Sequence, residues 1–264
     1  MIEYWTAALV FFIGLCVGSF ANVCIYRLPR NKSIVRPRSS CPVCNTPIKP
    51  WHNIPLLSFI ILRGKCAYCG ARISWRYPLI ELLGGLLFLL AYFKLFYGQN
   101  NLYFFVVALY LSSAFLIIFF IDLEHKIIPD SISLSGIVIG IGVSFLPGTP
   151  LNWLQSLIGA VVGGGAFLLI AELGDRLFKK ESMGGGDIKL AAMMGAFVGW
   201  KGILLIMALG SFLGALIGGS MLLLARDKEA ARTIPFGPYL VTAGLIVFYW
   251  GNDLINAYLR FVGI

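Results

Sequence analysis

Apolar runs, most of them about as long as the ~20 residues that cross a bilayer as a helix, make up most of the chain. Short polar segments or Pro- and Gly-containing turns separate them. The pattern predicts an all-α polytopic membrane protein with about eight transmembrane helices, the sixth of them short. The expected spans are 5–26, 78–97, 102–121, 131–146, 151–173, 188–200, 203–225 and 238–259.

Composition agrees with a chain that lies largely in lipid. Of the 264 residues, 59% are hydrophobic and 12% are charged, against roughly 25% charged residues in an average soluble domain. A soluble enzyme, a nucleic-acid-binding module and a secreted disulfide scaffold are therefore poor fits.

The net charge of +9 follows from topology. If the long loop after the first span is cytoplasmic, eight spans put all but three of the 21 Lys and Arg residues on the cytoplasmic side. Both termini then face away from the cytoplasm, and anionic lipid headgroups, with no nucleic acid, account for the charge. We expect a first helix at 1–26, a cytoplasmic loop domain at 27–77 and a helical membrane domain at 78–264.

Two Cys-x-x-Cys pairs lie in this loop, separated by 21 residues. Four thiolates at such spacing are typical of a tetrahedral zinc site, and a sphere closed by four cysteines is structural rather than catalytic. Two disulfides or four idle thiols are the alternatives, but disulfides rarely persist in the cytoplasm, and neither pair lies in an apolar span. The predicted zinc ligands are Cys41, Cys44, Cys66 and Cys69.

Two aspartates stand at the predicted cytoplasmic membrane edge, Asp122 after the third span and Asp187 before the sixth. Carboxylates in such positions are expensive and suggest function. If the two meet in a partly dry site they share a proton, as in an aspartic protease, where one carboxylate is the general base and the other the general acid.

Helix capping is the alternative interpretation of these acidic residues. It is sufficient for Asp187 taken alone and is favoured for Asp130, which follows a proline. It does not suit Asp122, because the helix dipole disfavours an anion at a C-terminus. Three glycines before Asp187 allow close backbone approach and a loop that can open.

Glu81, one turn into the second span, has two equally supported interpretations. It either reaches the interface and caps the helix, or it faces the interior and binds something cationic.

These features together resemble the bacterial type IV prepilin peptidases of the GxGD aspartic protease group, over nearly the whole chain. Asp122 with IPD at 128–130 is similar to the block around the first catalytic aspartate, and GGGDIK at 184–189 matches G-x-G-D-x-K, which holds the second. Further matching segments are GSFAN at 18–22, YRLP at 26–29, SSCPVC at 39–44, NIPLLS at 53–58, LRGKC at 62–66, ISWRYPLIE at 73–81 and PFGP at 235–238.

The resemblance implies a multi-pass inner-membrane enzyme that removes the basic leader of type IV prepilins, or of type II secretion pseudopilins, on the cytoplasmic side. Asp122 and Asp187 would be catalytic, with Gly184, Gly186 and Lys189 supporting their loop. It also implies N-methylation of the new N-terminus by S-adenosylmethionine. The methyl-transfer residues are unassigned, with Glu81 as a weak candidate.

Two other function classes fit the same features. A proton- or cation-coupled transporter also has aspartates among glycine-broken helices, although its carboxylates tend toward the midplane. A non-enzymatic assembly factor would use the zinc loop for docking and the aspartates as caps.

Overall fold

The computed structural model describes residues 2–97, 101–146, 149–179, 183–220 and 235–262. In these residues the regular structure is helical and no strand is present, apart from two isolated β-bridges in the loop after the first helix. The chain divides into two compact units, Met1–Ile117 and Ile118–Ile264.

The first unit is built on α1 (Ile2–Arg27) and α3 (Arg76–Ala91), which continues as the π-helical η3 (Tyr92–Phe96). Small residues let the two helices cross with their backbones in contact, since a Cβ on Gly14 would lie 2.8 Å from Cα of Gly85. The connection between them holds η1 (Leu28–Arg30), η2 (Pro50–His52) and α2 (Leu57–Ile61). The unit also contains most of α4 (Leu102–His125).

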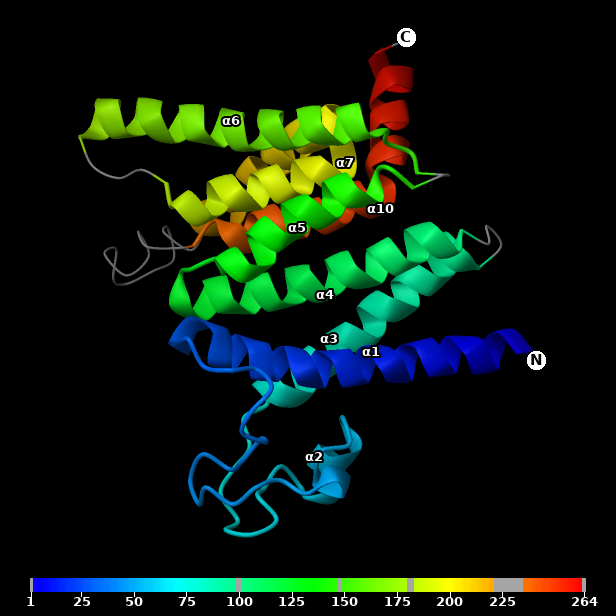
Figure 1. The fold of residues 1–264 in the computed structure, drawn as a ribbon, viewed down its shortest axis with the longest axis vertical. Coiled ribbons are helices and arrows are strands. Elements are labelled where there is room, and N and C mark those ends of the chain that lie inside the picture. The colour runs from blue at the N-terminus through cyan, green and yellow to red at the C-terminus, as the bar shows by residue number, and fades with distance from the viewer. Residues whose placement is uncertain (1, 98–100, 147–148, 180–182, 221–234, 263–264) are drawn as a thin grey trace. The chain divides into compact units, whose positions relative to one another are not determined.

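The second unit starts with the last turns of α4 and adds α5 (Asp130–Val143), α6 (Trp153–Phe178), α7 (Gly185–Leu213) and α10 (Gly237–Val262). The π-helical η4 (Gly214–Gly218) extends α7. Figure 1 shows α5, α6 and α10 around α7, and the structure has α7 in contact with all three.

Gly199 interrupts α7 with a φ of 72°, a conformation that suits glycine. The chain reverses there. A Cβ on Gly163 of α6 would lie 2.9 Å from the carbonyl carbon of Ala191 and 3.0 Å from Cγ1 of Ile203, whereas a straight helix would separate these two residues by about 18 Å. The expected spans 188–200 and 203–225 therefore correspond, over the described residues, to two antiparallel halves of α7.

Five segments among the described residues are long and apolar enough to cross a membrane: Tyr4–Arg30, Arg76–Phe96, Leu102–His125, Trp153–Leu177 and Gly185–Gly218. The expected number of eight is not confirmed. With 14 residues α5 is short for a bilayer, the two halves of α7 are counted as one segment, and α10 is not among the five. Several long apolar helices, as in a multi-pass helical membrane protein, are nevertheless present.

Candidate active site

Asp122 lies in the last turn of α4 and exposes only 5% of its surface. Its Oδ2 atom is buried and accepts no hydrogen bond from the described residues. Gly237, the first residue of α10, lies directly against the carboxylate, since a Cβ there would meet Oδ2 and come within 2.9 Å of Cγ. A buried carboxylate oxygen without a donor is unfavourable for folding, and such an unfavourable group is typical of a functional site.

Asp187 lies in the first turn of α7, and its Oδ1 atom is also buried without a partner among the described residues. The capping interpretation is wrong for it, because Gly184 is the N-cap residue and no side chain caps this helix. The charge of Asp122 is close enough to act on Asp187. The fold therefore brings the two carboxylates into one site, each with a buried oxygen that has no hydrogen-bond donor among the described residues.

The glycines before Asp187 do not form an open loop, because α7 begins at Gly185. Gly186 packs against Ile128 in the connection between α4 and α5, where a Cβ would lie 2.9 Å from Cβ of Ile128. A Cβ on Gly184 would make only an ordinary contact, 3.6 Å from the Asp187 carboxylate, and one on Gly185 would meet nothing within 4 Å. Gly186 is therefore the position that requires the absence of a side chain.

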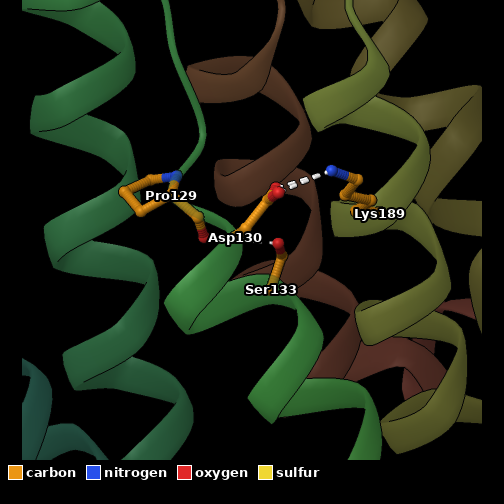
Figure 2. Close-up of polar contacts among 4 residues, drawn as sticks. All are labelled: Pro129, Asp130, Ser133 and Lys189. Atoms are coloured by element: carbon orange, nitrogen blue, oxygen red, sulfur yellow. Dashed lines mark hydrogen bonds and ion pairs between the residues drawn. The ribbon is translucent and has the colours of Figure 1, made fainter. Parts of the chain in front are cut away.

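Lys189, on the next turn of α7, forms an ion pair with Asp130 at the start of α5 (Figure 2). Its Nζ lies 2.7 Å from Oδ1 and 2.8 Å from Oδ2. The interpretation of Asp130 as a helix cap is wrong, because the N-cap residue is Pro129 and no side-chain cap bond is present. Ser133 fixes this first turn by donating its hydroxyl to the Pro129 carbonyl over 3.3 Å.

The four predicted zinc ligands come together in the first unit, with all Sγ atoms within 4.8 Å of one another and no disulfide between them. The Sγ atoms of Cys41 and Cys69 are 3.8 Å apart. Four sulfurs at the zinc–thiolate distance of about 2.3 Å in tetrahedral geometry are about 3.8 Å apart. The cluster thus fits a zinc ion.

The two Cys pairs form matching turns. The Cys41 N–H donates to the Thr46 carbonyl over 3.1 Å, and the Cys66 N–H donates to the Ala71 carbonyl over 2.8 Å. In each turn the residue after the second cysteine, Asn45 or Gly70, has a positive φ. This repeated geometry aims both thiol pairs at one point.

Hydrogen bonds from these turns favour the thiolate form, which binds metals, in Cys44 and Cys66. The side chain and backbone of Thr46 lower the pKa of Cys44 to about 6. The backbone amides of Cys69 and Tyr68 lower the pKa of Cys66. The backbone amide of Ala71 also lowers the pKa of Cys69, but desolvation and hydrogen bonds with the neighbouring thiols outweigh it and raise that pKa to about 11.

Glu81 has a structural partner. Its Oε2 atom accepts the backbone N–H of Leu56 over 2.9 Å, which ties the loop after α1 to α3. Neither expected interpretation included this contact, because the donor is a backbone group 25 residues away.

Gly237 is the site residue to which the sequence assigned no role. The signal was the PFGP segment at 235–238, which predicted a helix start and nothing about a carboxylate.

Comparisons with known proteins follow the same division of the chain. Residues 12–95 match the Bacterial Peptidase A24 N-terminal domain, which covers the cysteine cluster, and residues 109–219 match the Type IV leader peptidase family, which covers both aspartates. No solved structure matches.

Three relatives are named prepilin leader peptidase/N-methyltransferase. The protein from Xanthomonas campestris pv. campestris is 38% identical over 96% of this chain and 94% of its own length. The one from Myxococcus xanthus is 43% identical over 86% of this chain and 66% of its own length. The one from Pseudomonas aeruginosa is 36% identical over 95% of this chain and 92% of its own length.

Proposed function

The chain belongs to the type IV leader peptidase family, and from this premise we propose that Asp122 and Asp187 are the carboxylates with which it cleaves prepilin leaders. It is an enzyme with peptidase and N-methyltransferase activity, the two activities that its relatives' names state. Neither the transporter nor the assembly factor is favoured by these relationships.

One observation carries the catalytic proposal: Asp122 and Asp187 lie within electrostatic range of each other, each with a buried oxygen that no described residue occupies. A water held between the two oxygens loses its proton to one carboxylate as it attacks the scissile carbonyl. The other carboxylate carries the shared proton and gives it to the departing amine. No nucleophilic Ser or Cys is needed.

We propose that the protein crosses the bacterial inner membrane eight times, with α5, both halves of α7, and α10 each making one crossing. The reversal at Gly199 supports this count, because the second half of α7 runs antiparallel to the first half and leads back toward the side on which Gly185 lies. The loop domain 27–77 and both aspartates then face the cytoplasm, and both termini face away from it.

This arrangement suits a prepilin or pseudopilin substrate. Such a substrate has a basic leader followed by an apolar helix, which can lie in the bilayer among the spans while the scissile bond reaches the aspartates. The position of the substrate helix in the bilayer thus accounts for much of the recognition of the scissile bond.

We further propose that Cys41, Cys44, Cys66 and Cys69 hold a structural zinc, which stabilises a loop with few apolar residues. S-adenosylmethionine would supply the methyl group in the second reaction. The bond between Glu81 and Leu56 supports a structural role for Glu81 rather than one in methyl transfer.

The test is mass spectrometry of a prepilin incubated in detergent with S-adenosylmethionine and the purified enzyme. The wild-type enzyme should give a shortened, methylated product, whereas Asp122→Asn and Asp187→Asn should leave the prepilin intact. Glu172→Gln, which changes an exposed carboxylate on α6, is the matched control and should cleave normally. Cleavage by either aspartate variant would overturn the proposal.

A further inference from the structure

The Lys189–Asp130 ion pair joins the two segments that carry the aspartates. Asp130 ends the connection that follows Asp122 along the chain, and Lys189 follows Asp187 by two residues. We propose that this pair is a positioning device that holds the two segments at the separation catalysis requires, an inference that rests on the proposed function of Asp122 and Asp187.

The connection is attached to α7 at a second point. Ile128, which is buried, packs against Gly186, where even a methyl group would not fit. The apolar contact and the ion pair are two residues apart between Ile128 and Asp130, and three residues apart on α7. Together they fix both the distance and the rotation of the two segments. The ion pair is the polar half of this attachment (Figure 2).

The pair is poorly suited to a role in folding. The side chains of Lys189 and Asp130 are 39% and 57% exposed, and pairs this exposed contribute little to stability. The ion pair nevertheless has a well-defined geometry, because Nζ of Lys189 contacts both carboxylate oxygens of Asp130. Asp130 is also unavailable for helix capping in this arrangement.

A contact that adds little to the free energy of unfolding can still have a large effect on the catalytic rate. A displacement of about 1 Å in a catalytic group can reduce the rate by about a hundredfold. A substrate that binds chiefly through its apolar helix should bind equally well to a displaced site. Loss of the pair should therefore lower kcat and leave KM nearly unchanged.

A double-mutant cycle on the full-length enzyme tests the proposal. Asp130→Asn and Lys189→Gln should each lower kcat for prepilin cleavage by about tenfold, with KM within about twofold and the unfolding temperature unchanged. The double variant should lose no more than the worse single variant. Exchanging the charges, Asp130→Lys with Lys189→Asp, should recover part of the loss.

The matched control is another exposed ion pair in the same unit, between Arg176 and Glu172 within α6. Because it joins one turn of a helix to the next, Arg176→Gln and Glu172→Gln should leave kcat unchanged.

Three results would overturn the positioning role: an unchanged kcat in the single variants, losses that multiply in the double variant, or single variants that fail to fold. If Asp122→Asn or Asp187→Asn still cleaves, the proposed function fails first. If both are inactive while the pair variants cleave normally, only the positioning role fails.

Discussion

Gly237→Ala should slow the peptidase by up to about a hundredfold without unfolding it. The substitution adds one methyl group at the first residue of α10, where the backbone already touches the Asp122 carboxylate. Because Oδ2 and Cγ are the atoms that the methyl group meets, the change acts directly on a catalytic group.

The size of the effect follows from the contact. The new carbon would lie 2.9 Å from Cγ of Asp122, whereas carbons in ordinary contact are about 3.5–4.0 Å apart. The carboxylate or the start of α10 must therefore move by about 0.6–1.1 Å. A displacement of this size lowers the rate by up to about a hundredfold, which corresponds to about 2.7 kcal/mol in the activation barrier.

The assay is the initial rate of prepilin cleavage, with the unfolding temperature of each variant measured in the same detergent. Gly214→Ala is the matched control, because it adds the same methyl group beside Phe236 and Tyr239 at 3.5 Å, an ordinary contact. It should cleave at the wild-type rate. Full activity in Gly237→Ala, or equal losses in both variants, would refute the reasoning.

Two further predictions concern the zinc site and the helix packing. Cys41→Ser should reduce bound zinc from about one ion per chain, as measured by elemental analysis, and should impair methylation. The control is Cys16→Ser, which lies in α1 outside the cluster. Unchanged metal content in Cys41→Ser would contradict the zinc assignment. Gly159→Ala should destabilise the fold by about 1–3 kcal/mol in a denaturant titration, because the added Cβ would lie 2.7 Å from Cα of Gly199. Gly165→Ala, whose Cβ would meet nothing within 4 Å, should be neutral, and equal stability of the two variants would argue against the close packing of α6 on α7.

Hydropathy predicted most of the helices because the length of an apolar run is a local property. The expected span 102–121 became a helix that continues to His125, which leaves Asp122 buried in its last turn rather than at its end. The expected break between spans at 200–203 falls at Gly199, within one residue. The cysteine cluster was equally predictable from the sequence, since Cys-x-x-Cys spacing defines a local turn.

The partners of the acidic residues could not be predicted in this way. Capping is the interaction that a short sequence window offers to Asp130, and to Asp187 if it is taken alone, yet neither side chain makes a cap bond. Asp130 instead bonds Lys189, 59 residues away, and Glu81 bonds the backbone of a distant loop. The donor to a carboxylate depends on the tertiary fold. The neighbouring residues in the sequence show that a buried carboxylate needs a donor, but they do not show which residue supplies it.

Of the two expectations for the glycines before Asp187, close backbone approach agrees with the structure, whereas an open loop does not. Flexible glycines before a catalytic residue suggest a loop that opens, yet Gly185 and Gly186 are helical, and Gly186 is needed because Ile128 occupies the space of a side chain. Gly237 has the same role against Asp122. Both glycines reduce the distance between segments that are far apart along the chain. Since a methyl group at either position would separate these segments, the glycines, together with the Lys189–Asp130 pair, favour a site that is built rigid, with the substrate rather than the loop as the part that moves.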